Sequence, residues 1–410
     1  MNTLKKCWCR SYQFCLKAAI PLLPYHEPRI LSSVSQLPGV LTEAGIHSVL
    51  LITDAGIRSR GLTRPLENLL AESGIHCAVY DQTVANPTSR NVEEARQIYL
   101  QEDCQAIIGF GGGSSIDCAK GTGARIARPR TPLSEMEGIL KVHCSLPMLI
   151  AIPTTAGTGS EVTVAAVITD SKTHHKYAIT DFFLIPRIAV HDPELTSSLP
   201  GSLTASTALD ALTHAVEAYI GRSTTRDSRE NALKAVSLIF KSLDSAYTDG
   251  GDLQARADLL EASYLAGQAF SKSYVGYVHA IAHSLSGKYN LPHGYTNAVL
   301  LPWVLEAYGG SIHGKLRDLA VAAGIASPEA VPSIAAAAFI RAIRNMNRRY
   351  GIPCCFREIR EEDIPMLAAT ADREANPLYP VPVLMDQNQL AQLYKQVMTG
   401  YHGVRMEEIA

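Results

Sequence analysis

The sequence predicts an α/β half followed by an all-helical half. Two observations support this prediction. Up to about residue 200, short apolar runs of strand length alternate with helical patterns, and this alternation builds parallel crossover units. From Gly201 onward the strand signals disappear and long amphipathic helical patterns replace them. We therefore expect an α/β domain over residues 1–200, with residues 1–30 as an irregular or partly helical lead-in, and a helical domain over residues 201–410.

Length and composition agree with two domains in a cytoplasmic protein. A chain of 410 residues exceeds the size at which a single hydrophobic core stops growing. The net charge is -2, and the basic residues form no stripe that would bind nucleic acid. No apolar run is long enough for a membrane span. The apolar stretch Ala18–Leu23 is short and contains Pro21, so it is a poor signal-peptide core. The nine cysteines match neither a zinc ribbon nor a disulfide scaffold, which favours reduced thiols.

The expected elements follow from hydrophobic periodicity. In the first half they alternate in type: a helix over 34–44, a strand over 48–53, a helix over 62–73, a strand over 77–80, a helix over 91–101, strands over 106–110 and 148–152 separated by a helix over 118–127, and an extended stretch from residue 176. In the second half only helices are expected, over 202–220, 227–246, 253–271, 297–309, 328–349 and 387–398.

Two glycine-rich loops leave the carboxyl ends of predicted strands. The loop 111–114 joins a strand to a helix, so its backbone can approach a phosphate while the helix N-terminus offers free N–H groups. Its spacing differs from the Gly-x-Gly-x-x-Gly pattern, and taken alone a tight turn explains it equally well. The loop 153–161 leaves a second strand end, and such ends line the ligand crevice of open α/β sheets. Together the two loops favour a site for a pyrophosphate.

The helical half contains polar pairs at helical spacing. Asp210 and His214 stand one turn apart on one face of a predicted helix. His279 and His283 repeat that spacing, and His293 follows on a Pro-Gly loop. One carboxylate with neutral imidazoles is a donor set that suits Fe²⁺ or Zn²⁺. One such pair alone is more often an ordinary surface or core pair, but three histidines within fifteen positions favour a metal site. Periodicity does not separate His279 from His283, because both lie on one face.

Several separated segments resemble the iron-containing (group III) alcohol dehydrogenases, in the order that this family has them, from about residue 45 to 400. They are Asn86-Pro87-Thr88, the loop 111–114 with Asp117 and Lys120, the loop 153–161, Asp210–Tyr219, and His279–Gly294. The resemblance implies a dehydroquinate synthase-like architecture, in which a Rossmann-like dinucleotide-binding domain precedes an all-helical metal-binding domain. It implies hydride transfer between a primary alcohol, or its aldehyde, and NAD(H), with Fe²⁺ or alternatively Zn²⁺, in a homodimer or larger homo-oligomer.

The resemblance also implies roles for particular residues. The metal ligands would be Asp210, His214, His279 and His293, and His283 would be the catalytic histidine beside the nicotinamide. The dinucleotide would contact Asp54, Asn86, Gly112, Gly113, Ser114, Asp117, Thr154, Thr155, Thr163, Lys176 and His283. Asp54 matches the carboxylate that meets the adenosine ribose in NAD-preferring members. Phe270 and Tyr274 would line the substrate pocket, and Tyr274 stands where members that take small diols often have glycine.

Simpler interpretations compete for some of these residues. Asp54 could only cap the following turn, His283 could be a hydrogen-bonded core histidine, and Tyr274 could pack in the helical core or at a subunit surface. For Glu217, one turn beyond His214, a structural carboxylate is favoured over a group that supports a ligand. The chain departs from the family at Ala208, where glycine is common, and at Ser284, where proline is common. The lead-in before residue 30 matches the family only weakly.

Other functional classes fit the sequence less well. A zinc peptidase would have His-Glu-x-x-His, and position 280 is Ala. A glycerol dehydrogenase or a sugar-phosphate cyclase could share the architecture, but a phosphate-bearing substrate needs cations near the metal, and the flanking segments supply only Lys272 and Lys288. A non-catalytic protein that binds metal and nucleotide is the remaining alternative.

Overall fold

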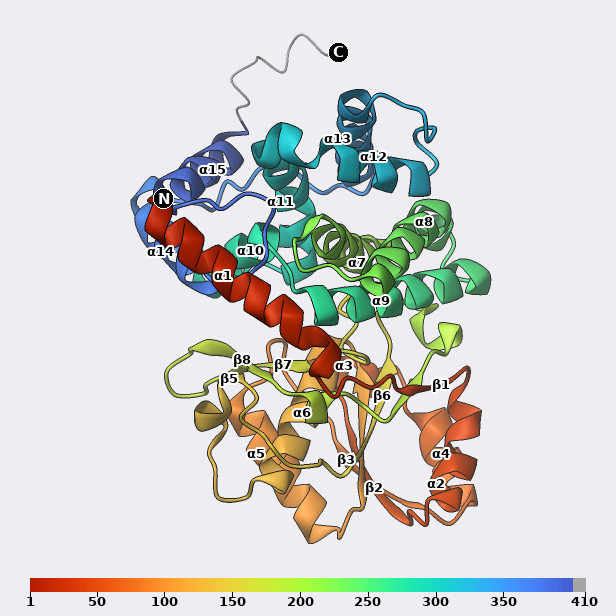
Figure 1. The fold of residues 1–410 in the computed structure, drawn as a ribbon. Coiled ribbons are helices and arrows are strands. Elements are labelled where there is room, and N and C mark those ends of the chain that lie inside the picture. Colours follow the sequence, from red (N-terminus) through yellow and green to blue (C-terminus); the bar gives the residue numbers. More distant parts are fainter. Residues whose placement is uncertain (401–410) are drawn as a thin grey trace. The chain divides into compact units, whose positions relative to one another are not determined.

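The computed structural model describes residues 1–400, which form two compact units (Figure 1). An α/β unit contains Pro24–Leu199 and Gly250–Gly267, and a helical unit contains Met1–Leu23, Pro200–Asp249 and the chain from Gln268 onward. The α/β unit ends where the strand signals end in the sequence. Two segments differ from the expected domain limits. The lead-in belongs to the helical unit, and Gly250–Gly267 belongs to the α/β unit, where Gly267 packs so closely on Gly159 that a Cβ at Gly159 would lie 2.8 Å from the Gly267 Cα.

The α/β unit is built on a parallel sheet of six strands in the order β1-β9-β6-β4-β2-β3. The strands are β1 (Arg29–Leu31), β2 (Ser48–Ile52), β3 (His76–Tyr80), β4 (Ala106–Gly111), β6 (Met148–Pro153) and β9 (Ile188–Val190). Strands β4 and β6 are central neighbours whose register pairs Gly111 with Pro153. Because both strands point the same way, the two glycine-rich loops leave the sheet side by side.

Helices cover both faces of this sheet. They are α2 (Leu37–Glu43), α3 (Ala55–Ser59), α4 (Arg64–Glu72), α5 (Ser89–Gln101) and α6 (Gly113–Ala127). In β2, Leu50 and Ile52 pack into the core cluster that includes residues of α5 and α6, whereas Val49 and Leu51 pack into the cluster that includes residues of α2 and α4. Burial on both faces explains why the strand is a continuous apolar run and does not alternate with polar residues. Each such side chain contributes about 1.5 to 3 kcal/mol of transfer free energy.

A second, smaller sheet completes the α/β unit. It has the order β5-β8-β7, with β5 (Gly138–Ile139), β7 (Ala165–Thr169) and β8 (Lys176–Thr180). The sequence predicted the stretch that forms β8 but neither of its partners. The buried ammonium of Lys120, on α6, donates to the carbonyls of Thr163 and Ala165, each at 2.8 Å. These bonds join β7 to the helix that begins at the first glycine-rich loop.

The helical unit contains helices from both ends of the chain. They are α1 (Thr3–Ala19), α7 (Gly201–Ile220), α8 (Arg226–Thr248), α9 (Leu253–Ser273, shared with the α/β unit), α10 (Tyr277–Tyr289), α11 (His293–Tyr308), α12 (His313–Ala322), α13 (Pro332–Arg349), α14 (Ile364–Ala375) and α15 (Gln387–Thr399). Every residue of α7 from Ala208 to Ile220 is buried. A helix that is apolar on all sides belongs in a core, and the polar residues it carries must find partners there.

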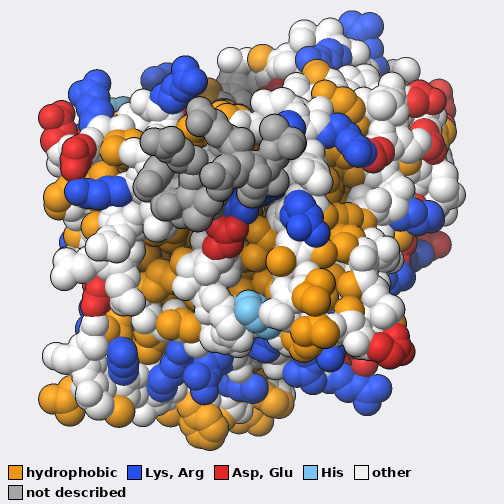
Figure 2. Space-filling view, turned by 90° about the horizontal axis from the view of Figure 1, so that it is seen from above, with side chains coloured by type: hydrophobic (Ala, Val, Ile, Leu, Met, Phe, Trp, Pro, Cys, Tyr) orange, Lys and Arg blue, Asp and Glu red, His pale blue; other side chains and the backbone are white. Residues whose placement is uncertain are grey.

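The described surface carries both signs of charge. On the face drawn in Figure 2, Lys and Arg side chains are interspersed with acidic, apolar and neutral ones. This mixture agrees with the balance of 37 basic and 39 acidic residues in the whole chain. Among the described helices, none has both the length and the hydropathy of a transmembrane span.

Candidate metal centre and cofactor loops

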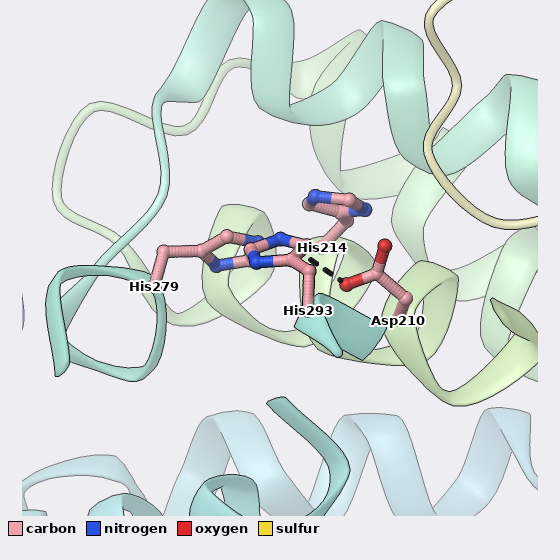
Figure 3. A group of neighbouring side chains, drawn as sticks. All are labelled: Asp210, His214, His279 and His293. Carbon is pink, nitrogen blue, oxygen red and sulfur yellow. Dashed lines mark ion pairs between the residues drawn. The ribbon is translucent and has the colours of Figure 1, made fainter. Parts of the chain in front are cut away.

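Three helices bring the four predicted ligands together (Figure 3). Asp210 and His214 stand one turn apart on α7, His279 lies in the first turn of α10, and His293 is the first residue of α11. Each side chain offers one ligand atom, and these four atoms lie within 4.8 Å of one another. The structure thus selects His279 and leaves His283 outside the group, a choice that helical spacing alone could not make.

The chemistry of this group fits a divalent cation. Asp210, His214 and His279 are buried, and His293 is partly exposed. Burial lowers the pKa of His279 well below its usual range, so its imidazole is neutral and has a lone pair for a metal. Burial also raises the pKa of Asp210 to about 7, although the hydrogen bond from Asn297 and the nearby His283 oppose this. A buried carboxylate without a cation is costly, and one carboxylate oxygen with three imidazole nitrogens is a set that Fe²⁺ and Zn²⁺ accept.

Asn297 is a fifth member of the site that the sequence interpretation missed. Its side chain is fully buried on α11, one turn after His293. The amide nitrogen lies 2.6 Å from Asp210 Oδ1, 3.2 Å from His279 Nε2 and 3.1 Å from His293 Nε2. Asn297 therefore connects three of the four ligand atoms. The sequence did contain one indication of this role, because Asn297 follows the candidate ligand His293 by four residues, at helical spacing.

Glu217 is a buried carboxylate that contacts the predicted ligand His279. Its buried carboxylate lies 2.6 Å from His279 Nδ1 and accepts the backbone N–H groups of Gly276 and Val278, each at 2.8 Å. With Nδ1 bonded to the carboxylate, Nε2 is the atom that faces the other ligands. Gly276 allows this close approach, because a Cβ there would lie 2.7 Å from Glu217 Oε1.

Replacing Glu217 by Gln is expected to weaken metal binding by about 10- to 100-fold, the usual cost of losing a partner that orients a ligand. The amide presents an NH₂ group where the carboxylate accepts three donors, so the His279 ring loses its fixed orientation. The dissociation constant, measured by competition with a chelator, tests this. Glu230→Gln, on the exposed face of α8, is the matched control. Equal affinities in the two variants would show that Glu217 has no role in metal binding.

His283 lies beside the ligands and is not a buried core histidine. Its ring stacks on that of His293, with centroids 5.1 Å apart and planes at 20°, and 32% of its side chain is exposed. Its Nδ1 lies 2.7 Å from Glu374 Oε1, and the hydroxyl of Tyr379 donates to the same oxygen at 2.8 Å. Burial alone would raise the pKa of Glu374, but His283 and these hydrogen bonds hold it below its usual range. Glu374 and Tyr379 were not identified from the sequence.

The two expected pocket residues lie on the segment that leads to α10. The ring of Phe270 stacks on the predicted ligand His214, with centroids 4.3 Å apart and planes at 20°. Tyr274 donates its backbone N–H to the Phe270 carbonyl at 2.7 Å and has a φ of 63°. That left-handed conformation favours glycine and is strained for a residue with a bulky side chain. The Phe270 ring thus lies against a predicted ligand, and Tyr274 follows one turn farther along the chain.

In the α/β unit the two glycine-rich loops touch. The Thr154 N–H donates to the Gly111 carbonyl at 3.0 Å, and a Cβ at Gly113 would lie 2.8 Å from the Thr158 side chain. Gly111 has a φ of 149°, and a Cβ there would lie 2.6 Å from Ser115 Oγ. Gly112 is the N-cap of α6 and provides no side-chain cap hydrogen bond. The N–H groups and positive dipole end of α6 can therefore serve a bound phosphate.

Some predicted cofactor contacts lie around the first glycine-rich loop, and others are buried and bonded within the protein. Lys176 Nζ donates to Asn86 Oδ1 at 2.7 Å, and the Asn86 N–H lies 3.4 Å from Ser114 Oγ, so these three polar side chains gather beside the first loop. Asp54 lies two residues after the end of β2 and caps α3, because its Oδ1 accepts the Ile57 N–H at 2.9 Å. Its Oδ2 lies 3.6 Å from where a Cβ of Gly111 would be, so the second oxygen faces the loop.

Other predicted contacts are bonded within the protein. The buried carboxylate of Asp117 accepts Ser160 Oγ and the Val167 N–H, each at 3.0 Å. Thr163 Oγ1 is 3.0 Å from the buried Lys120 ammonium. We therefore assign Asp117 and Thr163 to holding α6, the second loop and β7 together, an indirect contribution to a cofactor site.

Comparison with known proteins decides the family. Residues 31–193 match the profile described as "Iron-containing alcohol dehydrogenase", and residues 204–398 match "Fe-containing alcohol dehydrogenase family, C-terminal". The chain belongs to the iron-containing alcohol dehydrogenase family. The family predicted from the sequence motifs is thus confirmed.

Relatives in this family are similar over most of their length. A 1,3-propanediol dehydrogenase of Klebsiella pneumoniae is 36% identical over 381 residues, or 92% of this chain and 97% of that protein. Alcohol dehydrogenase 4 of Saccharomyces cerevisiae is 38% identical over 349 residues, or 85% and 90%. An NAD-dependent methanol dehydrogenase of Bacillus methanolicus is 35% identical over 341 residues, or 83% and 89%. The crystal structure of a 1,3-propanediol oxidoreductase matches with a TM-score of 0.87 at 34% identity, covering 92% of this chain and 99% of that one.

Membership settles the class of this protein. The iron-containing alcohol dehydrogenases are NAD(H)-dependent enzymes that bind iron, and this chain is an alcohol dehydrogenase of that class. The predicted architecture, an α/β unit with a mostly helical unit that carries the metal ligands, is confirmed. The enzyme is therefore favoured over a non-catalytic protein that binds metal and nucleotide.

Proposed function

We propose that this alcohol dehydrogenase interconverts short unbranched primary alcohols and their aldehydes with NAD(H), at a metal site formed by Asp210, His214, His279 and His293. The observation that carries the proposal is the convergence of these four ligand atoms within 4.8 Å in a buried site beside the partly exposed His283. Fe²⁺, or alternatively Zn²⁺, held by these four residues would supply Lewis-acid chemistry for the alcohol or carbonyl oxygen.

The protein's own groups then have separate tasks. Glu217 fixes the ring of His279, and Phe270 offers an apolar ring against His214 for the hydrocarbon part of the substrate. His283 is held at Nδ1 by Glu374, so Nε2 is the atom that we assign to accept the hydroxyl proton on oxidation and to return it on reduction. Its partial exposure allows that proton to exchange with solvent.

The α/β unit would hold NAD(H). The amides of Gly113 and Ser114 at the start of α6 suit the pyrophosphate, with Gly112 and Thr155 shaping the approach. The group formed by Asn86, Ser114 and Lys176 adds polar contacts beside that loop, and Asp54 would meet the adenosine ribose.

The test is an anaerobic assay of the Fe²⁺-reconstituted enzyme. A panel of alcohols with NAD⁺, and of aldehydes with NADH, is followed by the absorbance of the reduced nicotinamide. We expect turnover with short primary alcohols and their aldehydes. A protein that binds Fe²⁺ and NAD⁺ but turns over no member of the panel would contradict the proposal.

Replacing Tyr274 by Gly is expected to improve activity on longer or branched alcohols relative to short ones. A bulky ring one turn beyond Phe270 shortens the pocket, and removing it adds room. One methylene is worth about 1 to 3 kcal/mol in such a pocket, so the preference shifts gradually with chain length. The measurement is kcat/KM over an alcohol series. Tyr274→Phe, which keeps the ring, should retain the original profile, and an unchanged profile in Tyr274→Gly would place the ring outside the pocket.

Two properties of the working enzyme belong to this proposal. All nine cysteines are free thiols, which supports a reducing, cytoplasmic setting. An assembly of two or more identical chains is the expectation from the family resemblance, and light scattering of the purified enzyme tests it.

A further inference from the structure

Helix α1 precedes both segments that match the family profiles, since the first of these begins at residue 31. The helix is nevertheless anchored along its length in the helical unit. Lys5 Nζ lies 2.9 Å from Asp372 Oδ2 on α14, the amino group of Met1 pairs with Asp386, and Lys17 Nζ donates to the Arg222 carbonyl at 3.0 Å. These contacts fix the orientation of the helix.

The central contacts of α1 reach one particular segment, residues 376–386 between α14 and α15. Gln13, which is 3% exposed, donates its side-chain NH₂ group to the carbonyls of Pro377 at 3.0 Å and Tyr379 at 2.7 Å. One turn earlier, the Arg10 guanidinium donates to the carbonyls of Val381 at 2.7 Å and Pro382 at 2.9 Å. The segment forms no helix or strand, so its carbonyls have no partners within regular secondary structure. The bonds from Gln13 and Arg10 satisfy four of them.

The same segment is bonded to α10 on its other side. The fully buried Tyr277 hydroxyl accepts the Met385 N–H at 2.8 Å and lies 3.2 Å from Asn376 Oδ1. Tyr277 is the first residue of α10, the helix that carries His279 and His283. The segment is therefore held between α1 and the helix of the active-site histidines.

A continuous chain of hydrogen bonds leads from α1 to His283. Gln13 holds the backbone of Tyr379, the Tyr379 hydroxyl donates to Glu374 at 2.8 Å, and Glu374 lies 2.7 Å from His283 Nδ1. We propose that α1 is a strap that holds the segment 376–386 and, through Tyr379 and Glu374, sets the orientation of the His283 imidazole. Arg10 and Gln13 are then positioning residues for the reaction, and this inference rests on the proposed role of His283.

The test compares variants of the metal-loaded full-length enzyme. Gln13→Met keeps the side-chain volume but removes both donors, and Arg10→Met removes the bonds to Val381 and Pro382. We expect each to lower kcat by about tenfold, since small misplacements of a reacting group cost this much or more, while KM for the alcohol and the metal content stay near those of the unmodified enzyme. Lys6→Met is the matched control, because Lys6 is exposed on the same helix. Arg10→Lys, which keeps the charge and a donor, should retain more of kcat than Arg10→Met.

Combining Gln13→Met with Tyr379→Phe tests whether Gln13 acts through Tyr379 or only stabilises the fold. In Tyr379→Phe the bond to Glu374 is absent, so adding Gln13→Met should lower kcat little further. Independent, multiplying losses would overturn the proposal, as would kcat values for Gln13→Met and Arg10→Met equal to that of Lys6→Met. His283→Ala separates a failure of the strap proposal from a failure of the proposed role of His283. If it loses turnover while the strap variants do not, only the strap is wrong; if it keeps full turnover, the proposed role of His283 is wrong and the strap proposal fails with it.

Discussion

Replacing His214 by Ala is expected to abolish turnover and most metal binding. The side chain provides one of four ligand atoms, and it is packed between the rings of Phe270 and His279, whose centroids lie 4.3 and 4.6 Å from its own. The loss of affinity should exceed the roughly 10- to 100-fold that follows from losing a group that only orients a ligand. Metal content by mass spectrometry and kcat after reconstitution measure both effects.

Two further variants make this result interpretable. His293→Ala removes a ligand from a different helix and should have the same outcome, because the site requires α7, α10 and α11 together. His47→Ala removes an exposed histidine of the α/β unit and should leave metal and activity unchanged. Stoichiometric metal in both His214→Ala and His293→Ala would show that the ligand assignment is wrong.

The sequence predicted the parts of this site that depend on spacing within one element. Asp210 and His214 lie on one helix face, and the glycine-rich loops follow strand ends, so local periodicity and turn chemistry were sufficient. The choice of His279 over His283 needed the family resemblance, because both point the same way from α10. In the structure the ligand atom of His279 lies with those of the other three predicted ligands, and its other ring nitrogen contacts Glu217, which is 62 positions away in the chain.

What the sequence could not predict depends on contacts between distant segments. Glu374 lies 91 positions from His283, and Gln13 lies 366 positions from Tyr379. The sequence predicted residues 1–30 only as an irregular or partly helical lead-in, so it indicated neither the full length of α1 nor the carbonyls that this helix meets. In the small sheet β5 was missed for another reason: it has only two residues, too few for a pattern to emerge.

The unmodified enzyme is expected to prefer NAD(H) to NADP(H), and Asp54→Gly is expected to weaken that preference. Asp54 follows β2, and one of its carboxylate oxygens caps α3 while the other faces the Gly111 loop. The free oxygen can accept hydrogen bonds from ribose hydroxyls and would repel a 2′-phosphate. Two unit charges about 4 Å apart near a protein surface repel by about 1 to 4 kcal/mol, which corresponds to a preference of about fivefold at the low end and several hundredfold at the high end. The ratio of kcat/KM for NADH to that for NADPH measures it.

A second substitution at the same position separates charge from capping. Asp54→Gly also weakens the cap of α3, whereas Asp54→Asn keeps a good capping side chain and removes only the charge. If repulsion sets the preference, both variants lower the NADH to NADPH ratio, and only Asp54→Gly loses thermal stability. If Asp54 does no more than cap the turn, Asp54→Asn keeps the ratio of the unmodified enzyme. Equal or better kcat/KM with NADPH in the unmodified enzyme would contradict the role of Asp54 directly, because a carboxylate facing the ribose cannot favour the cofactor that carries the additional negative charge.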